Sequence, residues 1–179
     1  MRSRPLVAFD RLDTWEWRFC QRVTHLSRNT AWRRVLQTAS RLGDWPLWVA
    51  LIAAQPWLTP EGNRRLIQYS TIALVALTVY RLIKTRLCRE RPFITYLNGI
   101  HCGEPARDRY SFPSGHTMHA VMFSVMVAAH TPWLLVVILP LAVLIAISRV
   151  GLGLHYASDV LAGALIGYGF ALLSLYLVP

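Results

Sequence analysis

From Tyr110 to Ser148 the chain reads YSFPSGHTMHAVMFSVMVAAHTPWLLVVILPLAVLIAIS, without a single Asp, Glu, Lys or Arg. A second uncharged stretch runs from Val160 to Pro179. Apolar runs of this length are typical of helices that cross a membrane. Of the 179 residues, 54% are hydrophobic and 16% charged, and the mean hydropathy is +0.36. These values exclude a disordered chain, a disulfide scaffold and an ordinary soluble domain, and they predict an integral membrane protein.

Charged residues and turn clusters divide the chain into apolar spans on both sides of that stretch. Five are predicted, at residues 45–58, 66–82, 114–130, 133–150 and 158–178. Residues 6–28 place apolar side chains at helical spacing with arginines between them, which is typical of a helix lying in the membrane interface, although a helix packed against the bundle has the same pattern. We therefore predict an all-α integral membrane helical bundle with about five transmembrane helices and an N-terminal interfacial amphipathic helix. It forms one domain over residues 1–179, with residues 1–43 as an interfacial region and residues 44–179 as the transmembrane bundle.

The net charge of +10 could suggest nucleic acid, but the positions of the charges favour the lipid bilayer as partner. Nine of the nineteen basic residues precede Gly43 and seven lie between Arg81 and Arg109, next to apolar spans. Such clusters are typical of contact with anionic lipid headgroups. At the end of the second span, we interpret Arg81, Arg86 and Arg89 as anchors that extend their charge to the interface.

Two further patterns leave alternatives open. Gly163 and Gly167 lie four residues apart in the last span, which predicts close helix packing, either inside the bundle or between subunits, so the oligomeric state is open. Cys88 and Cys102 could form a disulfide if their loop faces an oxidising space.

Three polar segments interrupt the apolar chain, at residues 84–92, 112–116 and 148–159, and the parity of the spans places all three on one side of the membrane. Together they contain Lys84, Arg91 and Arg149, which suit a group with two negative charges and several acceptor oxygens, as in a phosphate. Ser114 and Gly115 stand at the start of a predicted helix, where a hydroxyl and backbone N–H groups favour an anion.

The same segments supply groups for acid–base and nucleophilic chemistry. His155 and Asp159 are four residues apart and share one face of a helix, so the carboxylate can fix the tautomer of the imidazole and leave its other nitrogen free to attack phosphorus. His116, on another helix, can protonate the leaving oxygen. No cluster of carboxylates suited to Mg²⁺ is present, so neither a metal nor another cofactor is expected.

These segments resemble the three-part signature of the type 2 phosphatidic acid phosphatase family, which also includes vanadium haloperoxidases and glucose-6-phosphatase. The pattern is Lys, six residues, Arg-Pro; then Pro-Ser-Gly-His; then Ser-Arg, about five residues, His, three residues, Asp, and residues 84–159 match every fixed position. The resemblance implies a phosphate site made of Lys84, Arg91, Ser114, Gly115 and Arg149. It also implies that His155 forms a phosphohistidine, that Asp159 orients it and that His116 is the general acid. Larger membrane members commonly have six spans, whereas here the segment before Trp45 is too charged to cross.

The resemblance implies a membrane lipid phosphate as substrate, such as undecaprenyl diphosphate, phosphatidylglycerophosphate, phosphatidic acid or lipid A. The alternative is a non-catalytic protein that binds or moves anionic lipid. A third hypothesis is a halide-oxidising vanadium enzyme, which is disfavoured because those relatives are larger soluble proteins and this chain consists mostly of predicted membrane spans. The resemblance also favours a bacterial inner membrane with the site facing the periplasm or exterior, whereas the basic residues before Gly43 favour the opposite side by the positive-inside rule.

Several polar residues near these segments have more than one interpretation. His119 shares a helix face with His116 and either lines the substrate path or takes part in packing. A loop carries Glu104, Arg107, Asp108 and Arg109, which form either a solvated loop or a rim around the substrate site.

Overall fold

The computed structural model describes residues 7–96, 100, 102–106 and 108–179. Across these residues the regular structure is helical, which confirms the predicted all-α class. The elements are α1 (Val7–Leu26), α2 (Thr30–Leu42), α3 (Trp45–Ala53), α4 (Gln55–Leu58), α5 (Gly62–Leu87), α6 (Pro92–Thr95), α7 (Gly115–His130), the short 3-10 helix η1 (Pro132–Leu134), α8 (Leu135–Gly151) and α9 (Ala157–Leu177). Within the described residues, three helical stretches are long and apolar enough to cross a membrane: Gly62–Leu87, Pro132–Gly151 and Ala157–Leu177.

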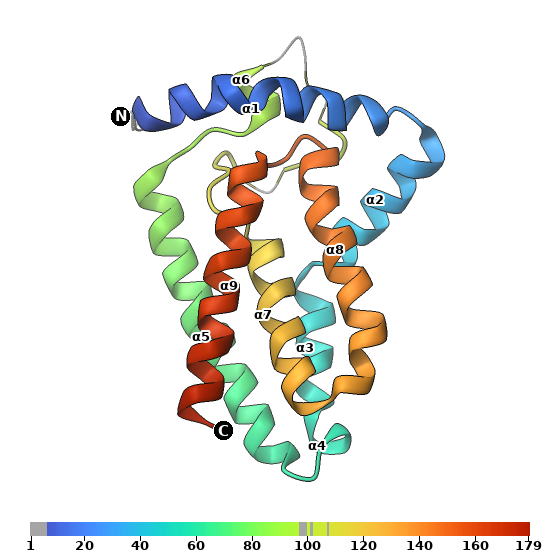
Figure 1. The fold of residues 1–179 in the computed structure, drawn as a ribbon, viewed down its shortest axis with the longest axis vertical. Coiled ribbons are helices and arrows are strands. Elements are labelled where there is room, and N and C mark those ends of the chain that lie inside the picture. Colours follow the sequence, from blue (N-terminus) through green and yellow to red (C-terminus); the bar gives the residue numbers. More distant parts are fainter. Residues whose placement is uncertain (1–6, 97–99, 101, 107) are drawn as a thin grey trace.

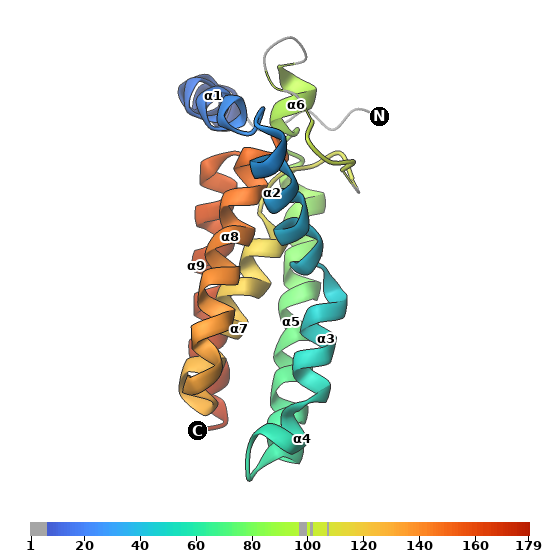
Figure 2. The same cartoon turned by 90° about the vertical axis from the view of Figure 1, so that its right-hand side faces the viewer.

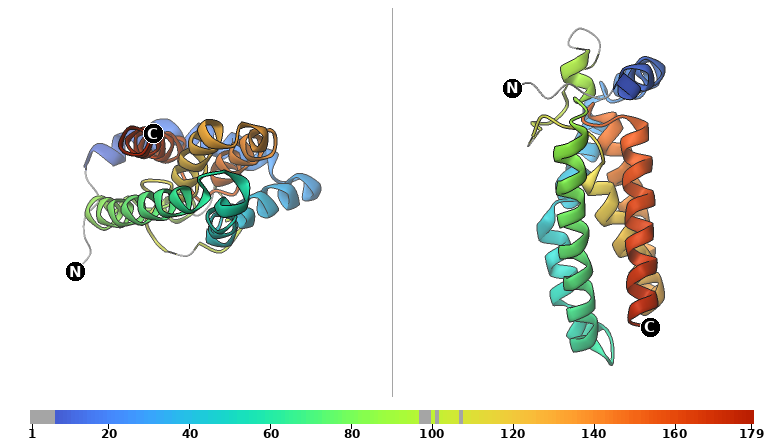
Figure 3. Two further views of the ribbon diagram at one scale, coloured as in Figure 1. Left: turned by 90° about the horizontal axis from the view of Figure 1, so that it is seen from below. Right: turned by 90° about the vertical axis from the view of Figure 1, so that its left-hand side faces the viewer.

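The long helices form two layers with one helix lying across their end. In the first layer α7 packs against α8 and α9, and α3 and α5 lie together in the second layer (Figures 1 and 2). The view along the bundle in Figure 3 shows both layers end-on. Helix α1 runs across the end of the bundle, above α8 and α9, while the C-terminal end of α9 lies at the opposite end (Figure 1).

The close contact between α7 and α9 depends on two glycines. A Cβ atom at Gly163 would stand 2.4 Å from the carbonyl oxygen of Ser114, and one at Gly167 would stand 2.1 Å from that of Met118. Both distances are far below van der Waals contact, so any side chain here would push α9 away from α7. Of the two packing arrangements that the sequence left open for this pair, the structure shows the one inside the bundle.

Helix α2 was not anticipated as a separate element. Its start is set by Asn29, whose side-chain oxygen accepts hydrogen bonds from the backbone N–H groups of Ala31 and Trp32. The helix packs along α8 and buries Leu36 completely. The chain therefore turns from α1 down the side of the bundle and reaches α3 with Asp44 at the junction. Residue 6, the first of the predicted amphipathic segment, lies outside the described residues.

Candidate active site

One cavity of about 700 Å³ brings the three polar segments together. Six of the eight predicted site residues line it: Lys84, Arg91, Gly115, His116, Arg149 and His155. They come from α5, the segment before α6, the start of α7, the end of α8 and the turn before α9. Residues up to 71 positions apart in the sequence therefore surround one space, as the parity of the spans predicted.

The cations Lys84 and Arg91 face each other across Asp108. Lys84 is buried at the last turn of α5, and its Nζ lies 2.8 Å from Oδ2 of Asp108 and donates to the hydroxyl of Tyr80 at 2.7 Å. Nη2 of Arg91 lies 3.0 Å from Oδ1 of the same carboxylate. Burial raises the pKa of Asp108, but the hydrogen bonds and charges of Lys84 and Arg91 outweigh it and hold the pKa below its usual value. A single carboxylate thus binds the two cations in the way that a phosphate would.

The third cation, Arg149, lies at the end of α8 and is buried. Its Nη1 donates to Oγ of Ser40 on α2 at 2.5 Å, and its buried Nε has no hydrogen-bond partner among the described residues. Nearby, a Cβ at Gly115 would stand 2.9 Å from the ring of Tyr80, so only glycine leaves this part of the cavity open. An unpaired guanidinium N–H in a cavity lined by cations is suited to an anionic oxygen.

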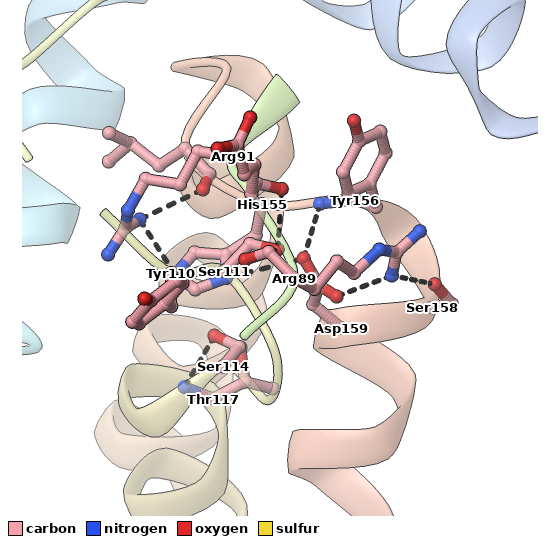
Figure 4. Close-up of polar contacts among 12 residues, drawn as sticks. Arg89, Arg91, Tyr110, Ser111, Ser114, Thr117, His155, Tyr156, Ser158 and Asp159 are labelled. Carbon is pink, nitrogen blue, oxygen red and sulfur yellow. Dashed lines mark hydrogen bonds and ion pairs between the residues drawn. The ribbon is translucent and has the colours of Figure 1, made fainter. Parts of the chain in front are cut away.

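His155, which lines the cavity, forms a buried pair with Asp159, which lies behind the cavity wall (Figure 4). Nδ1 of His155 lies 3.6 Å from Oδ2 of Asp159, and Nε2 lies 3.3 Å from Nη1 of Arg91. A guanidinium only donates hydrogen bonds, so Nε2 carries a lone pair and the ring proton resides on Nδ1, toward Asp159. The nitrogen on the cavity side is therefore the unprotonated one.

The surroundings of His155 disfavour the protonated form of its ring. Burial lowers its pKa well below the ordinary value of 6.5, and the positive charges of Arg149, Arg91 and Lys84 lower it further. A neutral imidazole beside three cations has the properties that an attack on a bound anion requires.

Sequence reasoning missed the partner of His116. Nε2 of this histidine lies 2.9 Å from Oδ1 of Asp44, at the junction of α2 and α3, and both residues line the cavity. Asp44 precedes an apolar span, as many interfacial carboxylates do, and no spacing in the sequence connects it with a residue 72 positions away. Only the packing of the second layer against the start of α7 reveals the pair.

Ser114 lies behind the cavity wall rather than on it. It is fully buried as the N-cap of α7, and its Oγ is 3.0 Å from the hydroxyl of Thr117 (Figure 4). His119 lines the cavity, and it also packs its ring on Phe123 and places Nδ1 2.9 Å from the carbonyl oxygen of Gly115, so its contacts agree with both of its interpretations.

The interpretation of Arg89 as an interfacial anchor is wrong. Arg81 and Arg86 are exposed, but Arg89 is completely buried. Its Nη1 donates to Oδ1 of Asp159 at 2.5 Å and to Oγ of Ser158 at 2.7 Å (Figure 4). Burial lowers the pKa of this guanidinium, but nearby carboxylates outweigh that effect and raise it. The burial of Arg89 cannot be recognised in the sequence. An arginine at the end of an apolar span is followed by the same kinds of residues whether or not carboxylates of another helix contact it.

The loop before α7 contributes to the rim of the cavity. Glu104 and Asp108 line it, whereas Arg109 pairs with Glu90 outside it; Arg107 lies outside the described residues. Cys102 is exposed and Cys88 is buried, and both thiols are free, so the structure does not contain the disulfide that the sequence left open.

Comparisons with known proteins agree with this architecture. A family model described as PAP2 superfamily matches residues 65–179. A protein from Sulfolobus acidocaldarius named undecaprenyl-diphosphatase is 32% identical over 102 residues, which cover 56% of this chain and 49% of that protein. The bacitracin transport permease protein BcrC of Bacillus licheniformis is 36% identical over 130 residues, which cover 69% of this chain and 61% of BcrC. The chain thus spans about half to three fifths of the length of these relatives.

A solved structure shares the fold. The crystal structure of a transmembrane PAP2-type phosphatidylglycerolphosphate phosphatase from Bacillus subtilis superposes with a TM-score of 0.72 at 23% identity, covering 96% of this chain and 87% of that one. The helical bundle with its apolar spans is therefore that of an integral membrane protein. The chain belongs to the PAP2 superfamily, which confirms the family indicated by the three motifs.

Proposed function

We propose that this protein is a membrane lipid phosphatase that removes a terminal phosphate through a phosphohistidine intermediate. The observation that carries the proposal is the position of Nε2 of His155, 3.3 Å from Nη1 of Arg91. Lys84 and Arg149 line the same cavity, and Asp159 lies behind the ring. Three cations supply the positive charge that a metal ion would otherwise supply, so the proposed chemistry is independent of metals.

Each step of the proposed reaction has a group in position. Nε2 of His155 attacks phosphorus and forms an N–P bond while the bond from phosphorus to the leaving oxygen breaks. His116 gives its proton to that oxygen, and Asp44, at 2.9 Å from Nε2 of His116, orients and stabilises the imidazolium before the transfer. A water molecule, deprotonated by His116, then attacks the phosphohistidine and releases inorganic phosphate. Asp159 stabilises the positive charge that His155 acquires.

We also propose that the incoming phosphate replaces Asp108. The carboxylate contacts Lys84 and Arg91 at 2.8 and 3.0 Å, and its side chain is 44% exposed, so it can leave the cavity. Arg91 keeps its bond from Nε to the backbone carbonyl of Asp108, at 2.8 Å, after the carboxylate has moved. Gly115 leaves room for a phosphate oxygen beside the start of α7, and Ser114 contributes by capping that helix, where the helix dipole favours an anion.

The shape of the cavity supports a lipid substrate. Below the charged groups it continues between α3 and α5 along apolar side chains. These include Trp45, Trp48, Val49, Ile52, Leu66, Ala73, Leu74 and Leu77. A charged pocket joined to an apolar groove fits a phosphate headgroup and its hydrocarbon tail. Undecaprenyl diphosphate, phosphatidylglycerophosphate and phosphatidic acid are the proposed substrates, with lipid A as a further one.

The proposed topology has five crossings in one domain, residues 1–179. The crossings are α3 with α4, α5, α7, α8 and α9, and α1 lies in the interface. Sixteen residues of α7 extend about 24 Å, less than the ~30 Å of the hydrocarbon core, so its N-terminal end meets the headgroup region. Three exposed apolar side chains on α1, Leu12, Trp15 and Phe19, support an interfacial position for this helix. We place the site on the outer face of a bacterial inner membrane, and 1–43 and 44–179 remain the interfacial and transmembrane parts.

The test is phosphate release from lipid phosphates by purified protein with a chelator present. We expect release by the unaltered protein, no release by His155→Ala and slow but measurable release by Asp159→Ala. Arg86→Gln, which changes an exposed arginine of the same helix as Lys84, keeps full activity. Equal rates from the His155→Ala and unaltered proteins would refute catalysis at this site. Anionic-lipid binding without turnover would favour the alternative, a non-catalytic lipid-binding protein.

Labelling of Cys102 can show which side of the membrane the site faces. The thiol of Cys102 is exposed and donates to the backbone carbonyl of Glu104, a residue that lines the cavity, whereas Cys20 and Cys88 are buried. An outward site predicts that a membrane-impermeant thiol reagent labels intact cells at Cys102. Labelling by permeant reagents alone would place the site on the cytoplasmic side.

A further inference from the structure

Helix α1 carries two carboxylates to the rear of the His155–Asp159 pair. We propose that Asp13 and Glu16 are positioning residues for this pair, acting through Arg89 and Ser158. The N-terminal helix then completes an active site whose three motifs all lie elsewhere in the chain. The proposal rests on the proposed function, since the pair that these residues position is the proposed nucleophile and its carboxylate.

The guanidinium of Arg89 is the centre of this arrangement. Its Nε and Nη2 donate to Oδ1 of Asp13 at 2.9 and 2.6 Å, and Nη2 also donates to Oε2 of Glu16 at 2.8 Å. Nη1 donates hydrogen bonds to Oδ1 of Asp159 and to Oγ of Ser158. The side chain is completely buried, and the ring of Tyr156 lies 4.0 Å from its central carbon. Every N–H group of Arg89 thus has a partner, and most of them are held by α1.

Glu16 also holds the first turn of α9 directly. Its Oε1 accepts the backbone N–H of Ser158 at 2.7 Å, and its Oε2 accepts the Ser158 hydroxyl at 2.6 Å. Asp159 is the next residue, and its Oδ2 accepts the backbone N–H of Tyr156 at 2.9 Å. A carboxylate at a helix N-terminus satisfies donors that the helix itself leaves unpaired. Glu16 therefore fixes the backbone from which Asp159 projects.

The distribution of hydrogen bonds explains why α1 matters for the reaction. Because Asp13 and Glu16 occupy Nε and Nη2, Arg89 has only Nη1 for Asp159 and binds one of its oxygens. The other oxygen, Oδ2, faces Nδ1 of His155 at 3.6 Å. Without the α1 carboxylates, the guanidinium is free to bind both oxygens of Asp159 in a fork. That arrangement would move Oδ2 away from Nδ1 of His155, which has no hydrogen-bond partner among the described residues, and would weaken the electrostatic attraction between the carboxylate and the Nδ1 proton.

The first test uses kinetics and a double-mutant cycle. We expect Asp13→Asn and Glu16→Gln each to lower kcat by about 10-fold, within the range of coupling between contacting residues, with KM and vanadate inhibition unchanged. Arg18→Gln, an exposed residue of the same helix, serves as the matched control with full activity. In an Asp159→Asn background the Asp13 and Glu16 changes should lose their effect, since they act through that carboxylate. Equal losses in both backgrounds would show a merely structural role and overturn the proposal.

The second test does not depend on turnover. With ¹⁵N-labelled histidine, the ring nitrogens of His155 report which one carries the proton. We expect the Nδ1–H form in the unaltered protein and in Arg18→Gln, and a shift toward Nε2–H in the Asp13→Asn/Glu16→Gln double variant. An unchanged spectrum in a double variant that keeps its unfolding temperature would refute the positioning role. A shifted spectrum together with an unaltered protein that releases no phosphate would instead contradict the proposed function alone.

Discussion

Removing the Asp108 carboxylate should make the cavity bind phosphate more tightly. This carboxylate holds Lys84 at 2.8 Å and Arg91 at 3.0 Å, the two cations that the proposed substrate must contact. With 44% of the Asp108 side chain exposed, each ion pair is worth about 0.5–1 kcal/mol. A ligand that displaces both pairs therefore gives up about 1–2 kcal/mol, which corresponds to a factor of about 5–30 in affinity.

The assay is inhibition of phosphate release by orthovanadate, whose trigonal-bipyramidal form resembles the attacked phosphate. We expect the inhibition constant of Asp108→Ala to fall by about 5- to 30-fold, and that of Asp108→Asn to fall in the same direction, because both remove the competing charge. Glu90→Gln is the control, since that carboxylate pairs with Arg109 outside the cavity. Weaker vanadate inhibition in Asp108→Ala would refute the reasoning and show that Asp108 holds the cations in place instead of competing for them.

Four other predictions follow from the same geometry. Asp44→Asn should lower kcat about 10- to 100-fold for lipid phosphates, because it weakens proton donation by His116 to the leaving oxygen. It should hardly change kcat for p-nitrophenyl phosphate, whose leaving group departs without being protonated. An equal loss for both substrates would contradict a role of Asp44 through His116. The acid limb of kcat/KM should lie below pH 6.5, because His155 stays neutral until the pH falls through its lowered pKa. Lys84→Gln removes a nearby positive charge, so it should raise the pKa of His155 and move this limb to higher pH. An acid limb that stays in place in Lys84→Gln would contradict the electrostatic cause. Gly167→Ala should destabilise the protein by about 1–3 kcal/mol in detergent unfolding. Gly169→Ala should not, because no described atom beyond its own stretch of α9 lies within 4 Å of the added Cβ; similar unfolding of the two variants would argue against close α7–α9 packing. Ala73→Trp should fill part of the apolar groove between α3 and α5 and raise KM about 10-fold for a long-chain lipid phosphate, while hydrolysis of p-nitrophenyl phosphate stays unchanged. An equal effect on both substrates would exclude this groove as the site of the lipid tail.

Local patterns of the sequence predicted the long helices, though not α2, and indicated most of the residues that line the cavity. Hydropathy is a property of consecutive residues, so the uncharged runs around Tyr110–Ser148 and Val160–Pro179 predicted helices that the structure contains as α7, α8 and α9. The motif spacings likewise predicted a shared phosphate cavity, because helix ends on one side of a bundle lie at one depth. Only Ser114 and Asp159, of the eight predicted residues, stand behind the cavity wall.

What the tertiary structure alone decided is which charges face each other. Arg86 and Arg89 both lie at the end of the second apolar span, yet Arg89 is buried against Asp13, 76 residues away, and Arg86 is exposed. Asp44 meets His116 across a similar separation. The physical reason is that burying a charge is costly unless an opposite charge arrives with it, and that partner comes from a different helix. Hydropathy along the chain determined where the helices form, and their packing determined which ionic groups they bring together.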